Sequence, residues 1–275
     1  MHLNFCENNQ TRLFKNLMKL PGFHPALKHF SLSILGSLLL STTCFALDTV
    51  IFPAPTPPAG ANPDTFPAPR NEWFLKFQSN LDATKGHQYD LLFEGDSITD
   101  FWQTRGKEVW DRHFSHLNSV DFGISGDRTE NVLWRLQEGQ VDGMDPKLIV
   151  LMIGTNNTAK SSPNQIVDGI KAVVAQYLQR CPHSHLLLLG VFPRSAKATD
   201  PIRAKINAIN TEIAHLDDGK RVTYLDIGQK FLQPDGTLTA EIMPDFLHPS
   251  AKGYEIWADT IQPIVDKYCP AAAAP

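Results

Sequence analysis

The stretch Tyr89-Asp90-Leu91-Leu92-Phe93-Glu94-Gly95-Asp96-Ser97-Ile98-Thr99 joins a short apolar run to a turn of small polar residues. Such a run, bounded by polar residues, is typical of a buried parallel strand. The turn places Ser97 at the carboxyl end of that strand, where open α/β sheets bind their ligands. A serine there can present its hydroxyl to a cleft and its backbone N–H to an anion. Because Gly, Asp and Ser are also common in ordinary turns, this stretch alone does not establish catalysis.

Apolar runs of the same kind recur along the chain and alternate with amphipathic helical patterns. The runs lack polar alternation, as expected of strands that are covered on both faces. The pattern predicts one α/β domain, a three-layer α/β/α sandwich with a five-stranded parallel sheet and right-handed crossovers. The expected strands span residues 89–94, 120–122, 148–153, 186–191 and 222–226. The expected helices span residues 71–85, 105–114, 129–138, 163–179, 201–216 and 250–268.

The composition is that of an ordinary globular protein. The chain has 275 residues, of which 42% are hydrophobic and 20% charged, with a net charge of −4. Since no run of Lys and Arg is visible, nucleic acid is not an expected partner. No cluster of Cys and His has zinc spacing, so no zinc site is expected. No cofactor is expected.

The amino end reads as a secretory signal peptide over residues 1–46. A basic region that ends at Lys28 and His29 precedes the apolar run 30–40, and small residues lead up to Ala46. The run is shorter than the roughly 20 residues that a membrane-spanning helix needs. We therefore expect cleavage after Ala46, a secreted or periplasmic protein, and no membrane span after leader removal. A lipoprotein acylated at Cys44 is a weaker alternative.

Residues 47–69 are rich in proline and are expected to form a stiff, extended linker. The segment is either a spacer or a strap that lies on the domain. The folded domain is expected over residues 70–269, followed by a short tail at 270–275. Loss of the leader leaves Cys181 and Cys269, which are candidates for a disulfide in an oxidising compartment.

Four loops at the carboxyl edge of the predicted sheet carry a possible set for serine hydrolysis. Ser97 is the candidate nucleophile, and His248 is the candidate base that takes its proton. Asp245 lies three residues before His248 and can hold the imidazole in the required tautomer. The same Asp and His, just before a helix, also fit an ordinary helix start.

Three groups are candidates for an oxyanion hole: the backbone N–H of Ser97, the backbone N–H of Gly126 and the side-chain amide of Asn156. A glycine at position 126 avoids a Cβ that would crowd the tetrahedral carbon. Gly123 is an alternative in the same loop. Both the glycines and Asn156 also suit plain turns.

Taken together, these blocks resemble the four blocks of the SGNH, or GDSL, hydrolase superfamily in order and spacing. The similarity is closer to the type formed by the catalytic α subunits of platelet-activating-factor acetylhydrolase Ib. The stretches that carry it are Gly95–Ser97, Phe122–Thr129, Val132–Leu136, Gly154–Asn157 and Asp245–His248.

The resemblance implies a flavodoxin-like sandwich, no metal, and Gly126 rather than Gly123 in the oxyanion hole. A homodimer is suggested by the resemblance alone. The chain departs from the pattern at Ser125, where the animal proteins carry glycine, and in its leader and proline-rich segment. The animal enzymes are cytosolic, so the natural substrate does not follow from the resemblance.

The expected function is that of a serine esterase that hydrolyses short O-acyl esters, above all acetyl esters, through an acyl-enzyme. The substrate would be a small-molecule or glycan ester, of carbohydrate or lipid origin. Alternatives are a lipase, thioesterase or lysophospholipase of broader chain length, an acyltransferase, and a non-catalytic carbohydrate-binding protein. The bulky side chains expected to crowd the nucleophile are Ile98, Phe101, Trp102, Phe192, Phe246 and Leu247.

Overall fold

Five parallel strands lie side by side in the order β2-β1-β3-β4-β5. This is the doubly wound, flavodoxin-like order, whose topological switch point lies between β1 and β3. The predicted fold class is therefore confirmed, and the ligand crevice is expected at the carboxyl ends of these two strands. The strands are β1 (Leu91–Gly95), β2 (Ser119–Asp121), β3 (Leu148–Met152), β4 (His185–Leu189) and β5 (Val222–Leu225).

The structure is a computed structural model that describes residues 52–53 and 55–270. The predicted signal peptide, its cleavage after Ala46, the alternative at Cys44 and the tail beyond Pro270 lie outside the described residues. Within the described part, no helix combines the length and the apolar character that crossing a membrane requires.

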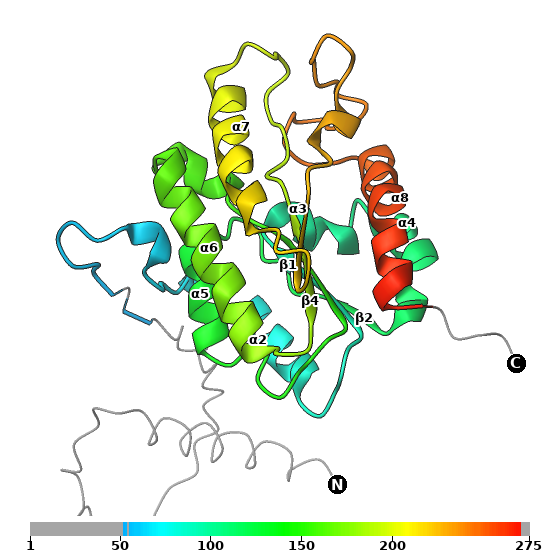
Figure 1. Cartoon of the computed structure of the whole chain (residues 1–275). Coiled ribbons are helices and arrows are strands. Elements are labelled where there is room, and N and C mark those ends of the chain that lie inside the picture. Colours follow the sequence, from blue (N-terminus) through cyan, green and yellow to red (C-terminus); the bar gives the residue numbers. More distant parts are fainter. Residues whose placement is uncertain (1–51, 54, 271–275) are drawn as a thin grey trace, which may run out of the picture. The chain divides into compact units, whose positions relative to one another are not determined.

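Helices cover both faces of the sheet, as Figure 1 shows. The side chains of β1, β3 and β4 alternate between two cores, one under α4 and α8 and the other under α5, α6 and α7. The strands are thus buried on both faces, which explains their continuous apolar sequences. The helices are α2 (Phe74–Thr84), α3 (Ser97–Asp100), α4 (Lys107–His113), α5 (Thr129–Gln137), α6 (Pro163–Arg180), α7 (Pro201–Ile213) and α8 (Ala251–Tyr268).

Local signals in the sequence set the helix ends. Ser162 caps α6 and forms a capping box with Gln165, and Asp200 caps α7 immediately before a proline. Ser250 caps α8, as the sequence predicts, by accepting a hydrogen bond from the N–H of Gly253 at 3.3 Å. All predicted strands and helices are present, with ends shifted by a few residues.

The described part of the proline-rich segment lies on the domain as a strap. The Asp64 side chain is buried and accepts a hydrogen bond from the Ser161 hydroxyl at 2.7 Å. The backbone carbonyl of Asp64 accepts one from Thr129 at 2.8 Å, and that of Ala68 accepts one from Asn131 at 2.9 Å. These contacts favour the strap over the spacer, and the segment even forms one turn of 3₁₀ helix at Pro63–Thr65.

The predicted disulfide is absent from the structure, and both Cys181 and Cys269 are buried free thiols. Cys181 ends α6 and packs in the core under α5, α6 and α7, whereas Cys269 ends α8 and packs in the core under α4 and α8. The sheet separates the two cores, so the thiols do not meet. The predicted disulfide is therefore wrong, because the number of cysteines left in the chain does not show that they lie on opposite faces of the sheet.

Candidate active site

Ser97 lies where β1 ends and the short helix α3 begins. Asp96 caps this turn, because its carboxylate accepts a hydrogen bond from the Ile98 N–H at 2.9 Å. The Ser97 hydroxyl lies 2.8 Å from Nε2 of His248, a residue 151 positions further along the chain. The fold therefore brings together the predicted nucleophile and base, with the serine side chain almost completely buried.

His248 is held by the loop that precedes α8. Its Nδ1 lies 2.8 Å from Oδ2 of Asp245, while Oδ1 of Asp245 accepts hydrogen bonds from the N–H of His248 at 2.7 Å and of Leu247 at 3.1 Å. To close this tight turn, Phe246 adopts a left-handed backbone with φ 55°. Non-glycine residues in this region are uncommon and cluster at functional sites.

The environment of Asp245 determines the tautomer of His248. Partial burial acts to raise the pKa of Asp245, but the hydrogen bonds from the backbone and imidazole of His248 outweigh it and lower the pKa to about 2. Asp245 is thus ionised near neutral pH and can only accept a hydrogen bond. The nitrogen that faces it, Nδ1 of His248, therefore carries the proton. In the neutral imidazole, Nε2 is then the free acceptor that faces the Ser97 hydroxyl.

The three predicted oxyanion donors lie on neighbouring loops. The N–H of Ser97, the first residue of α3, has no intrahelical partner. Among the described residues, no backbone or side-chain acceptor takes up the N–H of Gly126. The Asn156 amide donates one hydrogen bond to the backbone carbonyl of Asp127 at 2.9 Å, which leaves its second N–H for a ligand.

The two glycines of the β2 loop have different roles. The N–H of Gly123 donates to the Asp121 carboxylate at 2.8 Å, so it is not free for a ligand. Gly126 has φ 80°, and a Cβ at this position would meet the Arg70 guanidinium at 2.5 Å. The left-handed backbone therefore favours glycine at this position, and a Cβ would also force the end of the Arg70 side chain to shift.

A buried ionic network lies behind this loop. Arg135 donates from Nε to Asp127 at 2.9 Å and from Nη2 to Glu94 at 2.6 Å, and all three side chains are almost completely buried. Tyr177 and Gln140 donate further hydrogen bonds to Glu94. Burial raises the pKa of Asp127 to about 7, although the charge of Arg135 opposes this shift. The network ties β1, which leads to Ser97, to the loop of Gly126.

Two further side chains fix the Gly126 loop, and sequence reasoning missed both roles. Arg70, at the end of the strap, donates to the Ser125 carbonyl at 2.8 Å and lies 3.5 Å from the Asp127 carboxylate. The Ser125 hydroxyl donates to Asp100 of α3 at 2.6 Å. Ser125 thus links the Gly126 loop to the helix of the nucleophile.

Several residues predicted to line a substrate pocket belong to the core instead. Ile98, Trp102 and Phe192 are at most 1% exposed and pack under α4 and α8. One turn of α3 points Ile98 inward, and the following 3₁₀ turn does the same for Trp102. Phe101 and Leu247 remain half-buried at the site, and the Phe101 ring lies 4.9 Å from that of His248.

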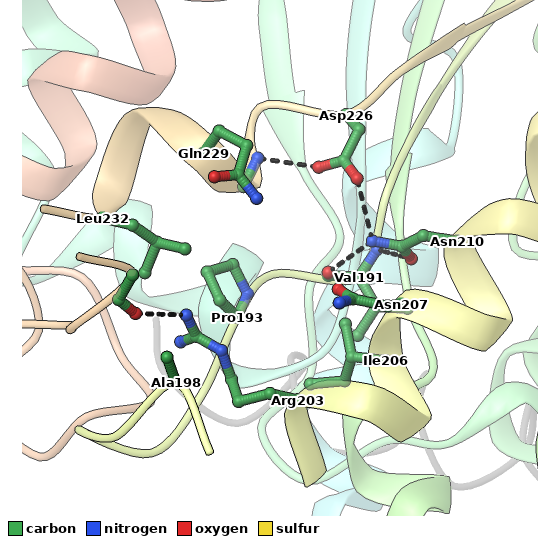
Figure 2. A pocket seen from close by; sticks show the side chains of 12 residues that line it. Val191, Pro193, Ala198, Arg203, Ile206, Asn207, Asn210, Asp226, Gln229 and Leu232 are labelled. Atoms are coloured by element: carbon green, nitrogen blue, oxygen red, sulfur yellow. Dashed lines mark hydrogen bonds between the residues drawn. The ribbon is translucent and has the colours of Figure 1, made fainter. Parts of the chain in front are cut away.

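Two hollows open at the carboxyl edge of the sheet. An open groove of about 830 Å³ borders the catalytic loop. A smaller pocket of about 180 Å³ lies between α7 and the ends of β4 and β5, and Figure 2 shows Asp226, Asn210 and Arg203 around it. None of Ser97, Asp245 and His248 lines this smaller pocket. The groove is lined by Thr158, Ala159, Arg194, Ser195, Ala196, Lys197, Asp200, Ile202, Asp245, Phe246 and Leu247.

One group of possible metal ligands lies away from this edge, on α4 and α8. His113, Glu255 and Asp259 place ligand atoms within 4.8 Å of one another. His113 already bonds to Gln262 and Glu255, and Glu255 also pairs with Arg112. These contacts form an ion-pair network, and the sequence held no signal for it because His113 lies 142 positions before Glu255.

The flavodoxin-like fold, with a serine and a histidine at its carboxyl edge, defines an α/β hydrolytic enzyme. Residues 93–256 match the GDSL-like Lipase/Acylhydrolase family. The chain belongs to this family, and it is a carboxylic ester hydrolase close to the platelet-activating-factor acetylhydrolase type.

The relatives support this assignment. The chain is 37% identical over 185 residues to the platelet-activating factor acetylhydrolase IB subunit alpha2 of Rattus norvegicus, covering 67% of this chain and 79% of the relative. It is 33% identical over 200 residues to the human alpha1 subunit, which corresponds to 70% of this chain and 85% of the relative. A putative acylhydrolase structure from Bacteroides fragilis has the same fold, with a TM-score of 0.58 and 20% identity over 69% of this chain and 95% of that one.

Proposed function

We propose that this esterase cleaves short acyl esters, acetyl esters above all, with Ser97 as nucleophile, His248 as general base and Asp245 as its partner. The observation that carries the proposal is the continuous chain of contacts from Oγ of Ser97 to Nε2 of His248 at 2.8 Å, and from Nδ1 of His248 to Asp245 at 2.8 Å. This geometry meets the distances that nucleophilic catalysis by serine requires.

In the first half-reaction, Nε2 of His248 takes the proton of Ser97 while Oγ bonds to the ester carbonyl carbon. The imidazolium that forms is stabilised by the ionised Asp245. As the tetrahedral intermediate collapses, the C–O bond to the alcohol breaks and Nε2 returns the proton to the leaving oxygen. Water then attacks the acyl-enzyme by the same route and releases the acid.

The negative charge of the intermediate would be stabilised by the N–H groups of Ser97 and Gly126 and by the Asn156 amide. All three donors sit on rigid turns, so they need no reorganisation during the reaction. The free N–H of Gly126 and the occupied N–H of Gly123 support Gly126 as the second donor.

A short acyl group is supported by the packing next to the nucleophile. Ile98, Trp102 and Phe192 fill the core beside Ser97, and interiors packed in this way hold few voids. The names of the mammalian relatives, which are acetylhydrolases, agree with an acetyl group.

The natural substrate proposed is an acetylated small molecule or glycan that an exported protein would meet. Export rests on the predicted leader. A homodimer is proposed only by analogy with the family.

Steady-state hydrolysis of 4-nitrophenyl acetate and 4-nitrophenyl decanoate by the purified protein tests the proposal. We expect turnover of the acetate, a much lower kcat/KM for the decanoate, and loss of activity in Ser97→Ala. Equal rates for the two esters would contradict the short acyl group. Turnover that survives Ser97→Ala would overturn the catalytic assignment.

A further inference from the structure

The group of side chains that α4 and α8 share has no part in the site at the carboxyl edge of the sheet. The two helices lie side by side (Figure 1). His113 ends α4, while Glu255 and Asp259 lie four residues apart and therefore on one face of α8. His113 and Glu255 are half-buried and Asp259 is exposed, so an ion from solution can reach the group.

A neighbouring glutamine determines which nitrogen of His113 carries the proton. Nε2 of Gln262 donates a hydrogen bond to Asp266 at 2.7 Å, which turns the amide oxygen of Gln262 towards His113. That oxygen lies 3.0 Å from Nδ1 of His113. Because an amide oxygen only accepts hydrogen bonds, Nδ1 donates, and Nε2 of the neutral imidazole keeps its lone pair.

The lone pair of His113 faces two carboxylates. Nε2 lies 3.1 Å from Oε1 of Glu255, and an oxygen of Asp259 lies within 4.8 Å of both ligand atoms. In this tautomer all three atoms are acceptors. Among the described residues, no cation and no hydrogen-bond donor pairs with the Asp259 side chain. A second proton on the imidazole would serve Glu255 and still leave Asp259 without a partner, whereas a metal ion can bind all three.

The residues around the group support its ligand atoms from outside. Arg112 pairs with Oε2 of Glu255, while Oε1 faces His113. In protein metal sites, a ligating histidine commonly donates its other ring N–H to an acceptor, and ligating carboxylates are themselves hydrogen-bonded. Gln262 and Arg112 stand in these two positions. One arginine against two carboxylates also leaves the group with a net negative charge when His113 is neutral.

We propose that His113, Glu255 and Asp259 form a structural Zn²⁺ site that joins α4 to α8, with water completing the coordination. An imidazole nitrogen and two carboxylate oxygens suit Zn²⁺, whereas Mg²⁺ and Ca²⁺ prefer oxygen ligands alone. Bonds of about 2.0–2.2 Å require the three ligand atoms to draw closer together, which rotation of the side chains on the two helices allows. The inference goes beyond the proposed function and does not depend on it.

Equilibrium dialysis of the chelator-treated protein against buffered Zn²⁺, with the bound metal measured by mass spectrometry, tests the inference. We expect one Zn²⁺ per chain at this site. In thermal unfolding, free Zn²⁺ at about 100 times Kd should raise Tm by about 5–10 °C. Mg²⁺ and Ca²⁺ at the same concentration should leave Tm unchanged.

Variants locate the bound metal. Asp259→Asn removes one ligand and leaves the pairs of Arg112, His113 and Glu255 in place. This variant and His113→Gln should each weaken Zn²⁺ binding by more than about a hundredfold, and Gln262→Ala should weaken it by about 10–100-fold. His183→Gln is the matched control, because His183 is exposed and pairs with a single carboxylate, that of Asp145. The control should leave Zn²⁺ binding and its effect on Tm unaltered.

The outcomes separate this site from the proposed function. If Asp259→Asn and His113→Gln bind Zn²⁺ as the wild type does, the metal lies elsewhere and the inference is overturned. It is also overturned if the wild type neither binds Zn²⁺ nor gains Tm, because the group is then only an ion-pair network. Hydrolysis of 4-nitrophenyl acetate without metal should be equal in the wild type and Asp259→Asn, so failure of the zinc site would leave the esterase assignment standing.

Discussion

The side-chain amide of Asn156 donates a hydrogen bond to the backbone carbonyl of Asp127, 2.9 Å away, and so joins the loops that follow β2 and β3. The loop after β2 also carries Gly126, whose N–H is the proposed second oxyanion donor. Two of the three donors are thus fixed relative to each other before a substrate arrives. This preorganisation is what gives an oxyanion hole its effect on rate.

Asn156→Ala should therefore reduce kcat by about 10²–10³ with a small change in KM, because the amide acts mainly on the charge of the transition state. The measurement is steady-state hydrolysis of 4-nitrophenyl acetate, with Ser97→Ala as the baseline. A variant with normal kcat would mean that Asn156 only tethers the Asp127 loop.

Arg135→Met should lower the free energy of unfolding by about 3–5 kcal/mol, because it leaves the buried Glu94 and Asp127 without their counter-ion. Urea unfolding followed by circular dichroism measures the change. Arg180→Gln breaks a pair with the exposed Asp142 and should cost less than about 1 kcal/mol. Similar losses in the two variants would show that the buried network contributes no more than a surface pair.

Asp96 provides a pH-dependent prediction. Burial raises the pKa of Asp96 from 3.8 to about 7, although the hydrogen bond from the Ile98 N–H opposes this shift. The second carboxyl oxygen of Asp96 is buried and has no hydrogen-bond partner among the described residues. A raised pKa means that the folded state holds the proton more tightly than the unfolded state. The contribution of Asp96 to the free energy of unfolding is therefore fully present below pH 3.8 and is lost as the pH rises through 7.

Asp96→Asn keeps an oxygen that can accept from Ile98 and removes the titration. We expect the variant to gain stability relative to the wild type on going from pH 5 to pH 8, in urea unfolding at both values. A difference that stays constant across this range would show that Asp96 does not titrate there.

Cys181 and Cys269 should both be found as thiols, because the sheet keeps them apart. Denaturation in iodoacetamide without a reductant, followed by peptide mass mapping, should show both residues alkylated. In the native protein both should react slowly, since burial raises the pKa of each thiol to about 11. A Cys181–Cys269 peptide pair linked by a disulfide would contradict the structure.

The sequence was sufficient to predict the order of strands and helices, and with it the edge at which the functional loops meet. Apolar runs and helical periods are local signals that predict the strands and helices. The rule that open parallel sheets bind ligands at the carboxyl ends of their strands then predicts where the functional loops lie. This is why Ser97, Asn156 and His248 could be expected at one edge of the sheet although they lie far apart in the chain. The pocket residues could not, because the direction of Ile98 and Trp102 depends on the single turn of α3.

Long-range polar contacts were likewise outside the reach of sequence patterns. Arg135 and Glu94 are 41 positions apart, and Arg70 and Ser125 are 55 apart, with no period that links them. A charged residue inside an apolar strand, as Glu94 is, was the one available signal, since a buried carboxylate requires a partner. That signal does not indicate which arginine supplies it.

Arg70 allows the role of the strap in catalysis to be tested. Its guanidinium donates to the Ser125 carbonyl and occupies the space that a Cβ on Gly126 would need, so it fixes the loop of the second oxyanion donor. Arg70→Ala should lower kcat about tenfold, the equivalent of one lost charge-assisted hydrogen bond, with KM little changed. Arg70→Lys should recover part of the loss. Lys85→Ala, which removes an exposed cation paired with Asp82 after α2, is the control and should leave kcat unaltered. Normal kcat in Arg70→Ala would show that the Gly126 loop keeps its shape through Arg135 and Asn156 alone, and that the strap contributes only to stability.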